Sequence, residues 1–113
     1  MNKPKTAIPT IFKVSGVSFH RDIIDTLECG QELKLEKDPD NKYDSNAIKI
    51  LNSENRMCGF VPKKYEINGE EFILNQRIIK KFEKLTTKYK LVVHSLYKWD
   101  GPTGLQVRFD KII

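Results

Sequence analysis

The chain of 113 residues is long enough for one domain with a real core and too short for two. Its hydrophobic fraction of 39% and charged fraction of 31% are those of an ordinary globular protein, and no apolar run approaches the length of a membrane span. The net charge of +5 favours a polyanionic partner. The first five residues lack the apolar segment of a signal peptide, so we expect a cytoplasmic protein that acts at intracellular DNA.

The N-terminal part predicts a leader, a strand and a short helix. Residues 1–9 hold two prolines among polar residues, so we expect a flexible leader followed by a single domain over residues 10–113. Alternation from Thr10 predicts a first strand, and the apolar spacing over residues 20–27 predicts a short helix. The side chains that we expect in the core from these segments are Phe12, Val14, Ile23, Ile24 and Leu27.

The middle of the chain predicts three strands. Residues 32–36 alternate cleanly, with Leu33 and Leu35 inward. Residues 46–51 and 57–61 flank a cluster of turn residues, which predicts a hairpin.

The C-terminal part predicts one longer helix and a second hairpin. Residues 63–65 should form a connecting loop, and apolar residues at mostly helical spacing predict an amphipathic helix over residues 70–85. Alternating residues 89–98 and 105–110 flank a Gly- and Pro-rich turn and should pair as strands. Six strands and two helices predict a mostly β fold, a small OB-like antiparallel β-barrel that is closed to avoid exposed edges.

The stretch from residue 38 to residue 48 is the most informative part of the sequence. It begins with Asp38 and Pro39, which suit the first positions of a type I turn, and it ends as a strand. Between them, Tyr43 and Asp44 place an aromatic ring beside a carboxylate, where a ligand can meet both. A plain turn whose Tyr packs on the core is the alternative. A calcium loop is disfavoured, because its glycine and glutamate positions hold Tyr43 and Lys49.

Positive charge is concentrated between residues 76 and 90. This segment has six bases and one acid, which equals the net excess of the whole chain. The bases of the predicted helix are Arg77, Lys80, Lys81 and Lys84. They indicate a nucleic-acid-binding face, with a merely solvated helix face as the alternative.

No pattern indicates catalysis, a cofactor or a metal. Neither His has a partner at catalytic spacing, and no glycine-rich phosphate loop is present. The two cysteines fall in no zinc spacing, and we expect both as reduced, partly buried thiols.

Four segments in this order resemble the HIRAN domain, in its stand-alone form from bacteria and their viruses. They are Val-Ser-Gly-Val-Ser-Phe at residues 14–19, Gly-x-x-Leu-x-Leu at 30–35, Asp-Pro-Asp-Asn-x-Tyr-Asp-x-Asn-Ala-Ile at 38–48, and Gly-Phe-Val-Pro at 59–62. The third segment is the specific one. The resemblance runs from about Thr10 to the C-terminus.

The resemblance implies a modified OB barrel that captures the 3′ end of single-stranded DNA, as in fork-remodelling Swi/Snf-type translocases. Tyr43 would stack on the terminal base, Asp44 would accept the hydrogen bond of the 3′-hydroxyl, and Asn41 would shape the same wall. Lys63 would neutralise a phosphate. An aromatic residue of the last hairpin, Tyr97 or Trp99, would stack on the next base.

One position departs from the family pattern. Ser18 and Phe19 stand where the eukaryotic end-binding members have an Arg-Tyr pair. Phe19 can stack on a base, but Ser18 cannot hold a phosphate as Arg does, and Arg21 or the helix lysines would have to substitute. Core packing is the alternative role for both Phe19 and Tyr97.

The chemistry of Asp44 supports end binding independently of the resemblance. A carboxylate repels phosphates, so it suits a nucleic-acid groove only where the ligand donates a hydrogen, as a terminal hydroxyl does. The favoured function is therefore binding of single-stranded DNA, or of another nucleic acid, without chemistry of its own and with a helicase or another DNA-processing protein as partner. A protein-interaction module that docks a peptide or an acidic protein is the alternative.

Overall fold

The computed structural model describes residues 7–98, 101 and 103–112. These residues form eight strands and four helical segments. The strands are β1 (Ile11–Lys13), β2 (Glu32–Lys37), β3 (Ile48–Leu51), β4 (Met57–Phe60), β5 (Lys64–Ile67), β6 (Glu70–Ile73), β7 (Tyr89–Tyr97) and β8 (Gly104–Lys111). The helices are the 3₁₀ turn η1 (Val17–Phe19), α1 (Arg21–Ile24), α2 (Leu74–Lys80) and α3 (Phe82–Thr87).

Six strands form one curved antiparallel sheet in the order β1-β8-β7-β2-β3-β4. Its two edges meet at one isolated bridge, where Ser15 and Phe60 exchange backbone hydrogen bonds of 2.9 and 2.8 Å. The mostly β, OB-like architecture is therefore confirmed. The sheet does not close into a barrel, because a single bridge rather than a ladder joins β1 to β4.

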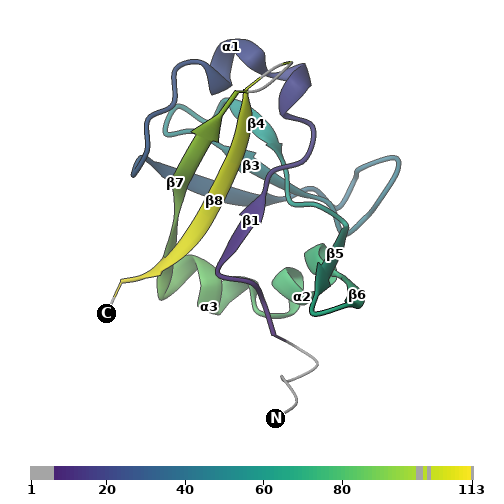
Figure 1. Ribbon diagram of the computed structural model, residues 1–113. Coiled ribbons are helices and arrows are strands. Elements are labelled where there is room, and N and C mark those ends of the chain that lie inside the picture. The colour runs from purple at the N-terminus through teal and green to yellow at the C-terminus, as the bar shows by residue number, and fades with distance from the viewer. Residues whose placement is uncertain (1–6, 99–100, 102, 113) are drawn as a thin grey trace.

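The helices cover the two ends of this sheet. Figure 1 shows η1 and α1 at one end, and α2 and α3 at the other, beside the small β5–β6 hairpin. Alternation in the strands and apolar spacing in the helices send their side chains into one core. The predicted inward residues Phe12, Val14, Ile23, Ile24, Leu27 and Leu33 are buried, and Leu35 is partly buried.

The segment between residues 63 and 85 differs from the prediction. The expected loop begins β5, and the expected helix start is β6, so the helix begins only at Leu74. The reason is a two-residue turn at Asn68 and Gly69, whose φ values of 53° and 81° both lie in the left-handed region. An Asn-Gly pair favours this kind of hairpin turn, and across it Tyr65 and Phe72 form an aromatic pair. The helical part is also divided in two at Lys81.

The cysteines are not both partly buried. Cys29 is exposed, Cys58 is fully buried on β4, and neither forms a disulfide. Burial raises the pKa of the Cys58 thiol to about 11.

Candidate nucleic-acid interface

The turn between β2 and β3 is held by the side chain of Asn41. Its amide donates to Asp38 Oδ2 at 3.0 Å, and its Oδ1 accepts the backbone N–H groups of Tyr43 and Asp44 at 2.9 and 3.1 Å. Beyond the paired residues of the two strands, hydrogen bonds from an Asn side chain to the backbone ahead of it take the place of the bonds between strands. The turn therefore fixes the backbone of both predicted contact residues. The Tyr43 side chain projects outward and is 94% exposed, so it is not packed on the core.

The Asp44 carboxylate is fixed by two donors. Asn46 N–H donates to its Oδ1 at 2.9 Å, and the Asn75 side-chain amide donates to its Oδ2 at 2.8 Å. The Asn46 backbone bond, the Asn75 bond and the positive charge of Lys63 together hold the Asp44 pKa below its usual value, although partial burial acts in the opposite direction. Asp44 is therefore ionised at neutral pH. Each oxygen keeps acceptor capacity for a further donor.

An open pocket of about 310 Å³ lies at this carboxylate. It is lined by Ser15, Asn41, Tyr43, Asp44, Ala47, Phe60, Val61, Lys63 and Asn75. The pocket therefore brings together four residues that the sequence analysis selected: Asn41, Tyr43, Asp44 and Lys63. They come from the central turn and from the segment after β4.

Ser15 and Phe60, which form the bridge between the sheet edges, also line the pocket. This close approach depends on Gly59, since a Cβ there would collide with the Ser15 carbonyl oxygen. Gly-Phe-Val-Pro therefore has a physical role, which is to bring β4 against the extension of β1. Ser15 and Phe60 were not selected from the sequence as site residues.

Asn75 also lines the pocket and was not selected by the sequence analysis. It lies in the first turn of α2, is only 2% exposed, and reaches Asp44 across 31 positions of sequence. The available signal was its place three residues before the buried Ile78, on the apolar face of the helix. A buried polar side chain needs a partner, but the sequence could not identify Asp44 as that partner.

Ser18 and Phe19 lie on η1, next to this pocket but outside its lining. Gly16 adopts a left-handed φ of 76° immediately before the turn, and η1 packs against β4. Phe19 is 85% exposed, so it is not a core residue. Tyr43 and Phe19 are thus two exposed aromatic rings on different segments, and of the two only Tyr43 lines the pocket.

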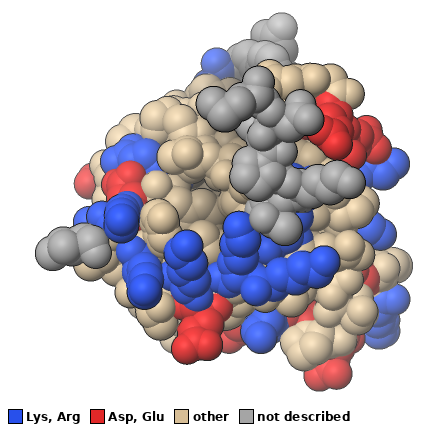
Figure 2. Space-filling model, turned by 90° about the horizontal axis from the view of Figure 1, so that it is seen from below, with Lys and Arg blue, Asp and Glu red and all other residues tan. Residues whose placement is uncertain are grey.

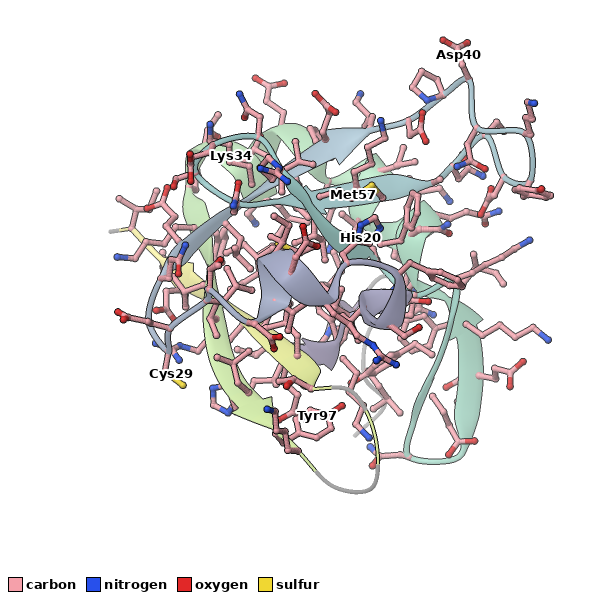
Figure 3. All side chains as sticks on the ribbon, turned by 90° about the horizontal axis from the view of Figure 1, so that it is seen from above. His20, Cys29, Lys34, Asp40, Met57 and Tyr97 are labelled. Atoms are coloured by element: carbon pink, nitrogen blue, oxygen red, sulfur yellow. The ribbon has the colours of Figure 1, made fainter. Side chains whose placement is uncertain are left out.

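The remaining predicted contact residues lie farther from the pocket. Arg21 lines a second hollow, between α1 and the end of the β7–β8 hairpin, together with Lys98. Tyr97 packs over its cross-strand partner Gly104, which has no room for a Cβ beneath the ring. In Figure 3, Tyr97 and Asp40, at the tip of the central turn, lie far apart with η1 and α1 between them. Trp99 lies outside the described residues.

The bases of α2 and α3 form a separate surface. Figure 2 shows a band of Lys and Arg side chains on the side of the molecule that carries these helices. Lys80 and Lys84 are exposed, whereas Lys81 and Arg77 are half-buried. Arg77 stacks on the Phe72 ring at 3.6 Å from its centroid and donates to the Ala7 carbonyl at 2.9 Å, so it also fastens the N-terminal segment.

Two absences hold for the residues of the chain that the structure describes. Their His, Cys, Asp and Glu side chains form no cluster that could hold a metal ion. None of their helices is long and apolar enough to cross a membrane.

Comparisons with known proteins give one match to a family model and one to a solved structure. The sequence model of the HIRAN domain family matches residues 10–78, which is more than half of the chain. Among solved structures, the crystal structure of the HIRAN domain of human HLTF is similar, with a TM-score of 0.59 and 22% sequence identity. That match covers 88% of this chain and 72% of the other, and it shows a shared fold. A search of curated proteins gives no match.

Proposed function

The chain belongs to the HIRAN domain family, whose domains are DNA-binding modules rather than catalysts, and we propose that it binds single-stranded DNA at a free 3′ end. The observation that carries the proposal is the Asp44 carboxylate, which two donors hold ionised in an open pocket beside Lys63. We propose that residues 10–113 form one domain of this type.

In this proposal Asp44 distinguishes an end from a continuing strand. The 3′-hydroxyl of a terminal nucleotide donates a hydrogen bond to the carboxylate, and a charge-assisted bond of this kind is among the stronger ones. A strand that continued through the pocket would place a phosphate there instead. Two negative charges at that separation repel each other, so the continuing strand is rejected.

The other pocket residues complement the rest of the terminal nucleotide. Lys63 is exposed at the pocket and supplies a positive charge for the phosphate on the 5′ side of the terminal sugar. The Tyr43 ring offers a face on which the terminal base stacks, without preference for one base. Asn41 acts indirectly, because it holds the backbone of Tyr43 and Asp44 in place.

Beyond the terminal nucleotide, the strand continues across η1. Phe19 is the second stacking platform, and Ser18 beside it offers a hydroxyl where an arginine would offer a charge. Arg21 and Lys98 supply positive charge farther along, and Tyr97 on the adjacent hairpin is a further stacking residue. Trp99, which lies outside the described residues, is proposed for the same role. The exposed Lys80 and Lys84, with Lys81 and Arg77, attract the phosphate backbone at longer range.

A binding module depends on another protein or domain for any further activity. We propose that a helicase or another DNA-processing protein supplies it, inside the cell where DNA is present.

Fluorescence anisotropy tests this proposal. The ligand is a short single strand labelled at its 5′ end and bearing either a 3′-hydroxyl or a 3′-phosphate. We expect the wild type to bind the hydroxyl form roughly tenfold or more tightly, since a hydrogen bond to a charged group contributes about 1.5–3 kcal/mol. Asp44→Asn should abolish this preference. Its amide can still bond Asn75, so the fold should persist.

The matched control is Asp40→Asn. It removes the same charge from the same turn, but Asp40 does not line the pocket, so the preference should be retained. Equal binding of both strands by the wild type contradicts end recognition. Binding of neither strand contradicts the DNA proposal and favours the protein-interaction alternative.

A further inference from the structure

Burial of the Asn75 side chain lowers the stability of the fold. Its amide nitrogen donates to Asp44, but its Oδ1 is buried without a hydrogen-bond partner among the described residues. An unsatisfied buried acceptor typically costs about 1–3 kcal/mol. A leucine has the same branched side chain of four heavy atoms and would place apolar groups beside Leu74 and Ile78 without that cost. Packing alone therefore does not account for an asparagine here.

The Asn75 amide holds one oxygen of the Asp44 carboxylate in place. The Asn46 N–H fixes Oδ1 from within the central turn, and the Asn75 amide fixes Oδ2 from α2. With one donor the carboxylate can rotate about its Cβ–Cγ bond, whereas two donors on different oxygens set its plane. α2 is anchored to the core by Leu74 and Ile78, so the second donor is rigid. Its first residue is also tied to the segment that carries Lys63, through a 2.8 Å backbone bond from Leu74 N–H to the Lys63 carbonyl.

We propose that Asn75 is a specificity-determining positioning residue, which orients the Asp44 carboxylate toward a hydroxyl donor. This inference rests on the proposed function and adds to it a residue outside the central turn. Asn75 acts through Asp44. The α2 helix therefore contributes to the pocket and to the basic surface. Its buried face supports the pocket, and its outer face carries Lys80.

The test replaces Asn75 by leucine. Asn75→Leu removes the donor and the orphaned oxygen while keeping the branched shape and the number of side-chain heavy atoms. The control is Ile78→Val, which perturbs the same buried face of α2 by one methylene and leaves the Asp44 contact intact. Two quantities are measured for each protein: the affinity ratio of the 3′-hydroxyl strand to the 3′-phosphate strand, and the pKa of Asp44 from a carboxyl ¹³C NMR titration.

Asn75→Leu should reduce the affinity ratio by roughly fivefold, because the bond between Asp44 and the 3′-hydroxyl is misdirected but not removed, whereas loss of that whole bond would reduce the ratio by roughly tenfold or more. The pKa of Asp44 should rise, since one of the bonds that favour its charged form is gone. The other ionisable side chains that line the pocket, Lys63 and Tyr43, are unchanged. Thermal stability should change little, because the loss of the orphaned acceptor and the greater bulk of the leucine methyl groups act in opposite directions. Ile78→Val should lower stability slightly and leave both the ratio and the pKa at their wild-type values.

The outcomes separate this inference from the function on which it rests. A wild type without a preference for the 3′-hydroxyl overturns the proposed function. A wild-type preference that Asn75→Leu retains overturns the role of Asn75 and leaves the proposed function standing. An unchanged Asp44 pKa in Asn75→Leu also overturns it, whatever the affinities. A fall in the ratio that Ile78→Val reproduces shows a general packing effect and counts against the inference.

Discussion

Substitution of Tyr43 by alanine should separate binding from folding more cleanly than any other change in the pocket. The side chain is 94% exposed, so its removal withdraws almost nothing from the core. Surface substitutions of this kind change stability by about 0.5 kcal/mol or less. The turn itself should persist, since the backbone N–H of Tyr43, and not its ring, donates the hydrogen bond to Asn41 Oδ1.

The affinity for DNA should fall much more. Stacking of one base on an aromatic ring contributes about 1–3 kcal/mol, which corresponds to a loss of roughly 5- to 150-fold in Kd. Tyr43→Phe keeps the ring and removes only the hydroxyl, so it should bind nearly as the wild type does. The assay is anisotropy with the 3′-hydroxyl strand, accompanied by thermal unfolding of all three proteins. Wild-type affinity of Tyr43→Ala would refute the stacking role, and so would an equal loss in Tyr43→Phe.

Three further predictions concern the bridge, the basic surface and the thiols. Gly59→Ala should destabilise the fold by about 1–3 kcal/mol in chemical denaturation, because its Cβ meets the backbone of the neighbouring strand, and an unchanged midpoint would contradict this packing. Replacing Lys80 and Lys84 together by alanine should reduce the slope of log Kd against log salt by about 1.4, if each lysine neutralises one phosphate of a single strand. An unchanged slope would show that these two lysines contact solvent and not the phosphates of the DNA. In a native-state titration with a thiol reagent near pH 8, Cys29 should react and Cys58 should react only after unfolding, because Cys58 is buried with its pKa raised to about 11. Rapid reaction of both thiols would contradict that burial.

Local patterns were sufficient for most of the sheet. Strict alternation identified the strand at residues 32–36 and the hairpin that became β7 and β8, because the two faces of a strand meet different surroundings. The turn at residues 38–47 could also be predicted, since Asn and Asp side chains bond the backbone close to them in sequence.

The error at residues 63–73 came from two signals that conflict. Phe72 and Leu74 fit the apolar face of a helix that continues to Ile78, so helical spacing was extended too far toward the N-terminus. The Asn68-Gly69 pair was the stronger signal, because both residues adopt the left-handed conformation that a tight hairpin requires.

The pocket could be only partly predicted. Tyr43 and Asp44 are neighbours in sequence, so one motif identified both. Asn75 reaches the site through the tertiary fold, and its partner depends on where α2 packs, which periodicity does not report. The bridge between Ser15 and Phe60 was missed for the same reason, since nothing local to either residue indicates the other.

The most direct test of end recognition compares a linear single strand with a covalently closed circle of the same sequence and length, both labelled at one internal base. The two ligands share every base and nearly every phosphate, and they differ in whether a terminus exists. End capture through Asp44 predicts that the linear strand binds roughly tenfold or more tightly, the equivalent of about 1.4 kcal/mol. Equal affinity for the circle would contradict it, and the pocket would then be a general site for single strands.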